Sequence, residues 1–209
     1  MPALRIGIDF DNTIAGYDRV FRNLARDSGL VDTAIYQTKS AIRDRVRELD
    51  DGDMKWQQLQ GQGYGARMQD AELIDGVGDF LQVCRQKNIV VQIISHKTEY
   101  GHFDPERVNL RDAARRWMQS KGFFDKDRHG FGLSPENVHF ETTRADKVAR
   151  IGACCCSIFI DDLPEVFLEP AFPEEITRYL FAPSGAADGP YKIMPSWQHI
   201  TDAIFTPGV

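Results

Sequence analysis

The sequence has 209 residues, of which 42% are hydrophobic and 27% charged, and its formal net charge is −6 at pH 7. This composition is typical of a globular chain that is long enough to build one sizeable core. The negative charge argues against a general nucleic-acid binder and against a protein that binds anionic membranes.

Two further features bear on location and on the cysteines. No apolar stretch is long enough to cross a bilayer, and the first residues lack a basic region followed by an apolar signal segment. We therefore expect a cytoplasmic protein. Three of the four cysteines are adjacent, at 154–156. This spacing is neither that of a zinc knuckle nor that of a redox pair, so we expect small buried residues that lead into a strand.

The first predicted strand, residues 4–10, ends in an unusual concentration of charge. The apolar run in LRIGIDFDNT is typical of a buried strand, yet Asp9 and Asp11 stand two residues apart at its end, with Thr13 after them. Buried carboxylates are costly unless they are paired or bind a metal. Later parts of the chain must therefore supply a partner for Asp9 and Asp11, either an opposite charge or further ligands of a metal.

Residues 17–73 show helical patterning and no convincing strand. DRVFRNLARDSGL has apolar residues at helical spacing, and KSAIRDRVRELDDG ends in a glycine that closes a second helix. Its alternating charges predict a solvated, ion-paired face. The third segment, DMKWQQLQGQGYGARM, begins as a helix and runs into three glycines, beside which Tyr64 and Arg67 are candidates to reach a substrate.

The rest of the chain alternates strands and helices, which predicts an α/β fold. We expect a Rossmann-like, doubly wound parallel sheet with helices on both faces. The expected strands are 4–10, 89–95, 136–140, 156–161 and 177–182, and the expected helices are 76–87, 107–121, 143–151, 163–168 and 196–204. The predicted division is a core of residues 1–16 and 74–209 with a small helical insertion at 17–73 between the first two strands.

Polar side chains gather at the carboxyl ends of these strands, where doubly wound sheets bind their ligands. Carboxylate oxygens form a hard site suited to Mg²⁺, whereas hydroxyl and ammonium groups suit phosphoryl oxygens. One carboxylate can attack phosphorus while another passes a proton to the leaving oxygen. The residues at this edge are Asp9, Asp11, Thr13, Ser95, His96, Lys97, Asp161 and Asp162, together with Lys147 on the helix after the third strand.

Four features occur along the chain in the order DFDNT, IISHK, Lys147 and FIDD. In this order they resemble the four motifs of the haloacid dehalogenase-like hydrolase superfamily, and the resemblance covers the whole chain. The resemblance implies a Mg²⁺-dependent phosphatase that acts on a small phosphorylated metabolite through an aspartyl phosphate. In that superfamily a carboxylate two residues past the nucleophile, here Asp11, marks phosphatases and phosphomutases. True dehalogenases and transport ATPases lack it.

The resemblance also implies a role for each residue. Asp9 would be the nucleophile, and Asp11 the general acid/base that also gives the metal its backbone carbonyl. Ser95 and Lys147 would hold the phosphoryl oxygens near the His96 backbone N–H, and Thr13 would brace the turn after the nucleophile. The implied metal set is Asp9, Asp11, Asp161 and Asp162, with Asp162 binding directly and Asp161 either directly or through a water. The expected substrate contacts are Thr13, His96, Lys97, Tyr64 and Arg67.

The helical insertion occupies the place of the superfamily's cap, which closes over the site and selects the substrate. This segment also resembles a bacterial group associated with surface-polysaccharide synthesis, which implies a phosphorylated sugar. Three alternatives stay open: a phosphomutase with the same intermediate, a polynucleotide phosphatase and a non-catalytic phospholigand-binding protein. The acidic net charge weighs against the polynucleotide. The sequence does not determine the oligomeric state.

Overall fold

The computed structural model describes residues 4–104 and 106–206. The chain forms two compact units. The sheet unit consists of Met1–Ile14, Leu73–His96 and Gly122–Val209, and the helical unit consists of Ala15–Glu72 and Lys97–Lys121.

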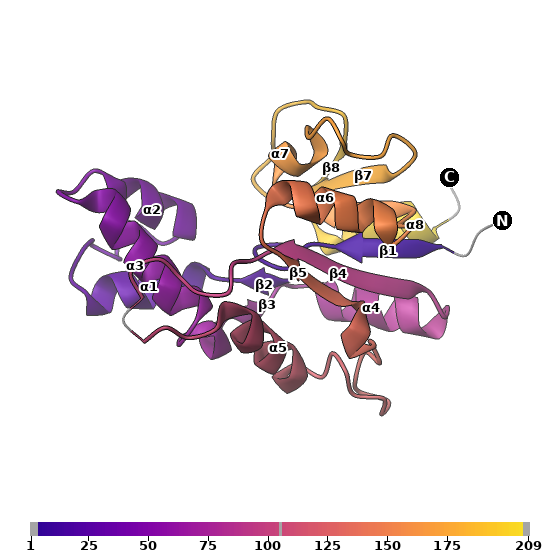
Figure 1. Ribbon diagram of the computed structural model, residues 1–209, viewed down its shortest axis with the longest axis horizontal. Helices are drawn as coiled ribbons and strands as arrows, with labels where there is room; N and C mark the ends of the chain where they lie inside the picture. The colour runs from indigo at the N-terminus through magenta and orange to yellow at the C-terminus, as the bar shows by residue number, and fades with distance from the viewer. Residues whose placement is uncertain (1–3, 105, 207–209) are drawn as a thin grey trace. The chain divides into compact units, whose positions relative to one another are not determined.

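The sheet unit is built on a six-stranded parallel sheet in the order β5-β4-β1-β6-β7-β8 (Figure 1). The α/β class and the doubly wound sheet predicted from the sequence are therefore confirmed. The strand β8 was not predicted, because three residues are too few to show a period. The strands are β1 (Arg5–Ile8), β4 (Val90–His96), β5 (Val138–Glu141), β6 (Ile158–Asp161), β7 (Thr177–Phe181) and β8 (Lys192–Met194).

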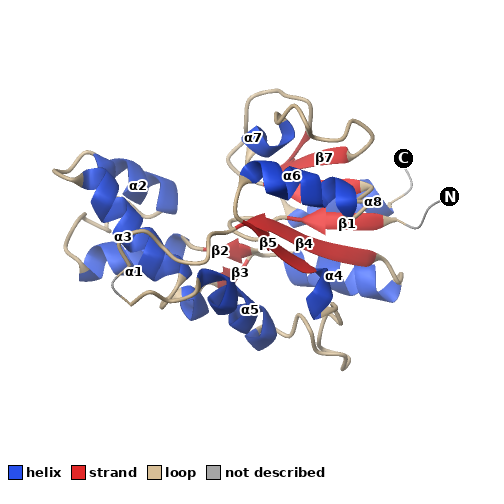
Figure 2. Ribbon diagram, in the orientation of Figure 1, coloured by secondary structure: helices blue, strands red, loops and turns tan. Residues whose placement is uncertain are grey.

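Helices cover both faces of this sheet (Figure 2). On one face, α6 (Arg144–Ala153) and α7 (Pro164–Phe167) join a buried apolar cluster with Phe159 of β6. On the other face, α4 (Val77–Gln86) packs against α8 (Trp197–Phe205), with the ring centroids of Phe80 and Trp197 5.0 Å apart. Because both faces are covered, central strands such as β6 are buried along their whole length.

Gly7 in β1 has a packing role at the centre of the sheet. A Cβ at this position would lie 2.5 Å from the ring of Phe159 and 2.8 Å from Sγ of Cys156. Burial raises the pKa of the Cys156 and Cys84 thiols to about 12, so both are neutral apolar residues. Within the described residues, the cysteines form no cluster able to hold a metal.

The helical unit holds the predicted insertion and one further helix. Two-residue strands β2 (Ala15–Gly16) and β3 (Glu72–Leu73) also pair with each other, and neither is long enough to be recognised from a sequence pattern. The helices are α1 (Asp18–Asp27), α2 (Lys39–Arg47), α3 (Gly52–Tyr64), the 3₁₀ turn η1 (Met68–Asp70) and α5 (Leu110–Ser120).

The glycines of α3 explain why α5 belongs to this unit. The segment predicted to begin as a helix and run into three glycines stays helical through Gly61 and Gly63 to Tyr64. A Cβ at Gly61 would lie 2.8 Å from Cβ of Asp104, and one at Gly65 would lie 3.1 Å from Cβ of Val108. Gly61 of α3 and Gly65, which follows the helix, are therefore packed closely against the segment that leads into α5. The predicted division placed this segment in the core, whereas the compact units group it with the insertion.

The charged face predicted on α2 is present. Its arginines make exposed ion pairs, including Arg45 Nη1 to Glu48 Oε2 at 2.8 Å and Arg47 Nε to Asp53 Oδ1 at 3.0 Å. Within residues 4–104 and 106–206, no helix combines the length and the apolar character needed to cross a membrane.

Candidate active site

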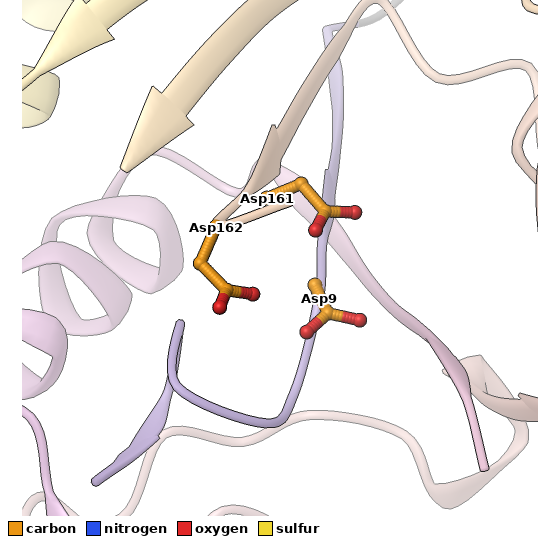
Figure 3. Close-up of side chains that lie close together, drawn as sticks. All are labelled: Asp9, Asp161 and Asp162. Atoms are coloured by element: carbon orange, nitrogen blue, oxygen red, sulfur yellow. The ribbon is translucent and has the colours of Figure 1, made fainter. Parts of the chain in front are cut away.

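Three carboxylates meet at the carboxyl edge of the central strands (Figure 3). Asp9 follows β1, Asp161 ends β6, and Asp162 comes next in the chain. Each offers an oxygen, and these three oxygens lie within 4.8 Å of one another. The sheet brings these residues together, because β1 and β6 are parallel neighbours. The Asp9 backbone N–H also donates a hydrogen bond to the Ile160 carbonyl at 2.9 Å.

Lys147 brings a positive charge to this group from α6. The helix is capped by Thr143, whose Oγ1 accepts a hydrogen bond from the Asp146 N–H at 3.1 Å. This start places Lys147 in the first turns of the helix, where its side chain is almost fully buried. Its Nζ lies 2.6 Å from Asp9 Oδ1 and 2.6 Å from Asp161 Oδ2. Burial acts to lower the pKa of Lys147, but the charges of Asp161 and Asp9 outweigh it and raise the pKa above its usual value.

Asp161 is fully buried, and its two oxygens differ. Oδ1 accepts a hydrogen bond from the Leu163 N–H at 3.0 Å. Oδ2 has the Lys147 Nζ nearby but no hydrogen bond of normal geometry. Burial raises the pKa of Asp161, the charge of Asp9 raises it further, and Lys147 opposes both. A cation beside Oδ2 would favour the ionised carboxylate.

These residues fit a hard divalent cation. The donor set is carboxylate oxygen throughout, which suits Mg²⁺ rather than a thiophilic metal. The three carboxylates outnumber the single ammonium, which leaves negative charge for a cation to neutralise. The incompletely bonded Oδ2 of Asp161 supplies a buried acceptor for it. Three of the four residues predicted as metal ligands are thus together; for the fourth, Asp11, only the backbone carbonyl was implied as a ligand.

Asp162 is oriented by the turn that follows Asp9. Thr13 Oγ1 donates to Asp162 Oδ1 and Asn12 Nδ2 to Asp162 Oδ2, both at 3.3 Å. Thr13 is fully buried, and its carbonyl accepts a hydrogen bond from Trp197 Nε1 at 3.0 Å. The hydroxyl predicted to contact substrate is thus directed at a carboxylate.

Asn12 and Trp197 were not among the predicted site residues. Asn12 has φ of 59°, a left-handed conformation that asparagine tolerates better than most residues, so its place in DFDNT offered a signal. Trp197 offered none, because nothing in a sequence links residue 197 to residue 13.

The other predicted residues of the sheet unit lie at the same edge. Ser95 is almost fully buried in β4, where its Cα pairs with that of Phe140, and His96 is the exposed last residue of this strand. Asp11 is half-buried, two residues beyond Asp9. Their roles toward a phosphoryl group stay predictions.

Tyr64, Arg67 and Lys97 lie in the helical unit. Arg67 Nε pairs with Asp70 Oδ2 at 2.5 Å, and its Nη1 lies 4.0 Å from Asp27 Oδ2, so acids of its own unit engage the guanidinium. The Lys97 ammonium lies 4.9 Å from the centroid of the Tyr64 ring. Substrate contact by these three residues also stays a prediction.

Comparisons with known proteins identify the fold. No protein-family model and no curated protein matches the sequence. Solved structures do match over nearly the whole chain. Protein Tyrosine Kinase A of Mycobacterium tuberculosis is 15% identical with a TM-score of 0.60, covering 98% of this chain and 99% of its own. A hydrolase of the haloacid dehalogenase (HAD) family from Deinococcus radiodurans, with bound phosphate and sodium, is 13% identical with a TM-score of 0.52, covering 97% and 95%. A HAD-superfamily hydrolase of Ehrlichia chaffeensis is 12% identical with a TM-score of 0.53, covering 96% and 95%.

The chain therefore has the haloacid dehalogenase-like fold, and at that level the resemblance predicted from its four motifs is confirmed. A shared fold does not fix the reaction, as the names of these neighbours illustrate, since one is a kinase and two are hydrolases. The residues of the site, and not the fold, must therefore indicate which reaction this protein catalyses.

Proposed function

We propose that this protein is a Mg²⁺-dependent phosphatase that hydrolyses a small phosphorylated metabolite through an aspartyl phosphate on Asp9. The observation that carries the proposal is the group of three carboxylates within 4.8 Å, with the buried Lys147 ammonium 2.6 Å from two of them. Hard oxygen donors beside a fixed cation are what the transfer of a negatively charged phosphoryl group requires. We keep the predicted cytoplasmic location and small-molecule substrate as part of this proposal.

The first half-reaction transfers the phosphoryl group to the protein. An oxygen of Asp9 attacks phosphorus, the bond from phosphorus to the substrate's alcohol oxygen breaks, and Asp11 donates a proton to that oxygen. Lys147 fixes the orientation of the Asp9 carboxylate through its contact with Oδ1. Ser95, on the neighbouring strand β4, would donate its hydroxyl to a phosphoryl oxygen.

The second half-reaction releases inorganic phosphate. Asp11 accepts a proton from a water molecule, whose oxygen attacks phosphorus, and the bond from phosphorus to Asp9 breaks to restore the carboxylate. Asp9, Asp161 and Asp162 would hold Mg²⁺, which when bound neutralises negative charge on the nucleophile and the phosphoryl oxygens. Thr13 and Asn12 keep Asp162 in position for this task.

The test is phosphate release from a panel of sugar, nucleotide, amino-acid and short oligonucleotide phosphates, measured with Mg²⁺ for wild type and Asp9→Asn. We expect at least one substrate to be hydrolysed and Asp9→Asn to lose turnover while remaining folded, because the change removes the nucleophile but little volume and leaves Asp161 beside Lys147. A chelator should abolish activity and added Mg²⁺ should restore it. Near wild-type turnover by Asp9→Asn would reject the nucleophile, and full activity in chelator would reject the metal.

A further inference from the structure

A cavity of about 270 Å³ lies within the sheet unit, away from the candidate active site. It is bordered by the second half of α4, the start of β4 and the segment 131–137 that leads into β5. Val91 in its lining precedes Ser95 by four residues of β4, which is about 13 Å along an extended strand. The cavity is therefore separate from the carboxylates that meet at the opposite edge of the sheet.

The lining of this cavity is mostly apolar and contains one charged side chain. Its volume is just below the range of about 300–1,000 Å³ that is usual for small-molecule sites, so a ligand here would be smaller than a typical drug. Of the described residues in the lining, Arg85 alone carries a charge, because burial raises the pKa of the Cys84 thiol to about 12. The apolar residues of the walls include Leu81, Ile89, Val91, Phe131 and Leu133.

Backbone carbonyls of the loop before β5 hold the Arg85 guanidinium in place. Its Nη1 donates to the carbonyls of Asp127 and Gly130, and its Nη2 donates to the carbonyl of Lys126 at 2.6 Å. The Asp127 carboxylate is engaged within the loop, since its Oδ1 accepts hydrogen bonds from the N–H groups of His129 and Gly130 at 2.8 Å and 2.9 Å. These two bonds lower the pKa of Asp127 most, and the charge of Arg85 contributes least.

The guanidinium keeps hydrogen-bond donors for a ligand along one of its edges. Arginine has five N–H groups, and within the described part of the chain the one on Nε and one of the two on Nη2 make no hydrogen bond. Nε and Nη2 share one edge of the guanidinium plane, so together they can bind both oxygens of a carboxylate. Gly132 leaves room beside this edge, because a Cβ at position 132 would lie 3.3 Å from Nε of Arg85.

The walls that come from the loop are also held in place. The Phe131 N–H donates to the Gly122 carbonyl at 2.9 Å, and the Leu133 N–H donates to the Phe123 carbonyl at 2.8 Å. The rings of Phe131 and Phe123 pack edge to face, with their centroids 5.2 Å apart. The cavity is therefore preformed, which lowers the entropic cost of binding a ligand.

We propose that this cavity binds a small carboxylic acid, whose carboxylate pairs with Nε and Nη2 of Arg85 and whose apolar part lies against the walls. The positive guanidinium disfavours an amine, and an uncharged compound lacks the ionic part of the interaction. This site goes beyond the proposed phosphatase function and does not depend on it. Arg85 was not among the site residues predicted from the sequence, because its bonds to the loop join segments that are distant in the chain.

The experiment compares acids with uncharged compounds that have the same apolar part. Hexanoate is paired with hexanamide, and phenylacetate with phenylacetamide, in calorimetric titrations of the full chain. We expect the acid of at least one pair to bind with a Kd about tenfold or more below that of its amide. The two pairs show whether an alkyl or an aromatic body is preferred. Equal binding within both pairs, or binding of neither acid, overturns the inference.

Variants assign the binding to Arg85. Arg85→Met removes the charge and the donors but keeps a long apolar side chain, and it should weaken binding of the preferred acid about tenfold or more. The matched control is Gln82→Met on the same helix, where Gln82 Nε2 donates to the Gly130 carbonyl at 3.1 Å and lies outside the lining. This control loses a bond to the same loop and should bind the acid like wild type. Unchanged binding in Arg85→Met, or an equal loss in both variants, overturns the inference.

A second pair of variants decides the site if Arg85→Met does not fold. Ile89→Trp places a larger side chain at a half-buried position of the wall and should weaken binding of the preferred acid about tenfold or more. Ile193→Trp makes the same change at a half-buried position of β8, outside the lining, and should bind the acid like wild type. Wild-type affinity in Ile89→Trp, or an equal loss in both tryptophan variants, overturns the inference.

Discussion

The charged groups of the sheet unit and those of the helical unit are positioned by different means. In the sheet unit each acid stands at the end of a parallel strand, so the backbone ladder brings Asp9 and Asp161 to one edge. In the helical unit no ladder joins Lys39, Tyr64 and Lys97. Lys39 on α2 and Lys97 in the loop after β4 both approach the ring of Tyr64 on α3. Backbone pairing places residues by topology, whereas helix packing places them by the shapes of particular side chains.

The charged groups of the two units also have different kinds of neighbour. In the sheet unit, buried carboxylates surround a buried ammonium, so each charge has an opposite neighbour. In the helical unit, two ammonium groups approach the same ring. Three variants test how each unit holds its residues in place.

The largest effect is expected from Lys147→Met. The change leaves Asp9 and Asp161 buried without their shared cation, which should lower the free energy of unfolding by about 3–5 kcal/mol, measured by urea denaturation without added Mg²⁺. The matched control is Arg150→Met on the same helix, whose exposed pair with Glu141 should contribute no more than about 1 kcal/mol. Equal losses in the two variants would show that Lys147 is not a buried compensating charge.

A smaller effect is expected from Gly61→Ala in the helical unit. Its Cβ would lie 2.8 Å from that of Asp104, which is held in place by hydrogen bonds from the N–H groups of Glu106 and Val108. Such overpacking should cost about 1–3 kcal/mol in urea denaturation.

The control for this variant is Gly152→Ala in α6, where the nearest atom would lie 3.5 Å from the new Cβ. Alanine there should add about 0.5–1 kcal/mol, because it is the better helix former. Stabilisation by both changes would mean that α3 is not closely packed against residue 104.

The smallest effect is expected from Thr13→Val, which removes the hydroxyl that donates to Asp162. Because Asp162 is a proposed Mg²⁺ ligand, loss of the group that orients it should weaken Mg²⁺ binding about tenfold, measured by calorimetric titration. Thr13→Ser keeps the hydroxyl and should bind Mg²⁺ like wild type. If the valine variant also binds like wild type, Thr13 does not position Asp162 for the metal.

The sequence was sufficient to predict those parts of the protein that follow from the local apolar pattern of a strand and from the parallel arrangement of the strands. The central predicted strands β1, β4 and β6 were recognisable because burial on both faces leaves a nearly continuous apolar run, and in β6 this burial extends over the whole strand. Once those strands run parallel, Asp9 and Asp161 must end at the same edge, and a helix start at Thr143 carries Lys147 toward them.

Three-dimensional contacts were needed to show which elements share a unit and which side chains support the site. Gly61 could have ended the helix α3 or formed part of its packing face, and the helix that continues to Tyr64 with Asp104 opposite Gly61 resolves that choice. The hydrogen bond from Trp197 to the Thr13 carbonyl and the approach of Lys39 to Tyr64 join residues distant in the chain. Such contacts leave no periodic pattern and no motif in the sequence. They depend on the shapes of side chains that come together only when the chain is folded.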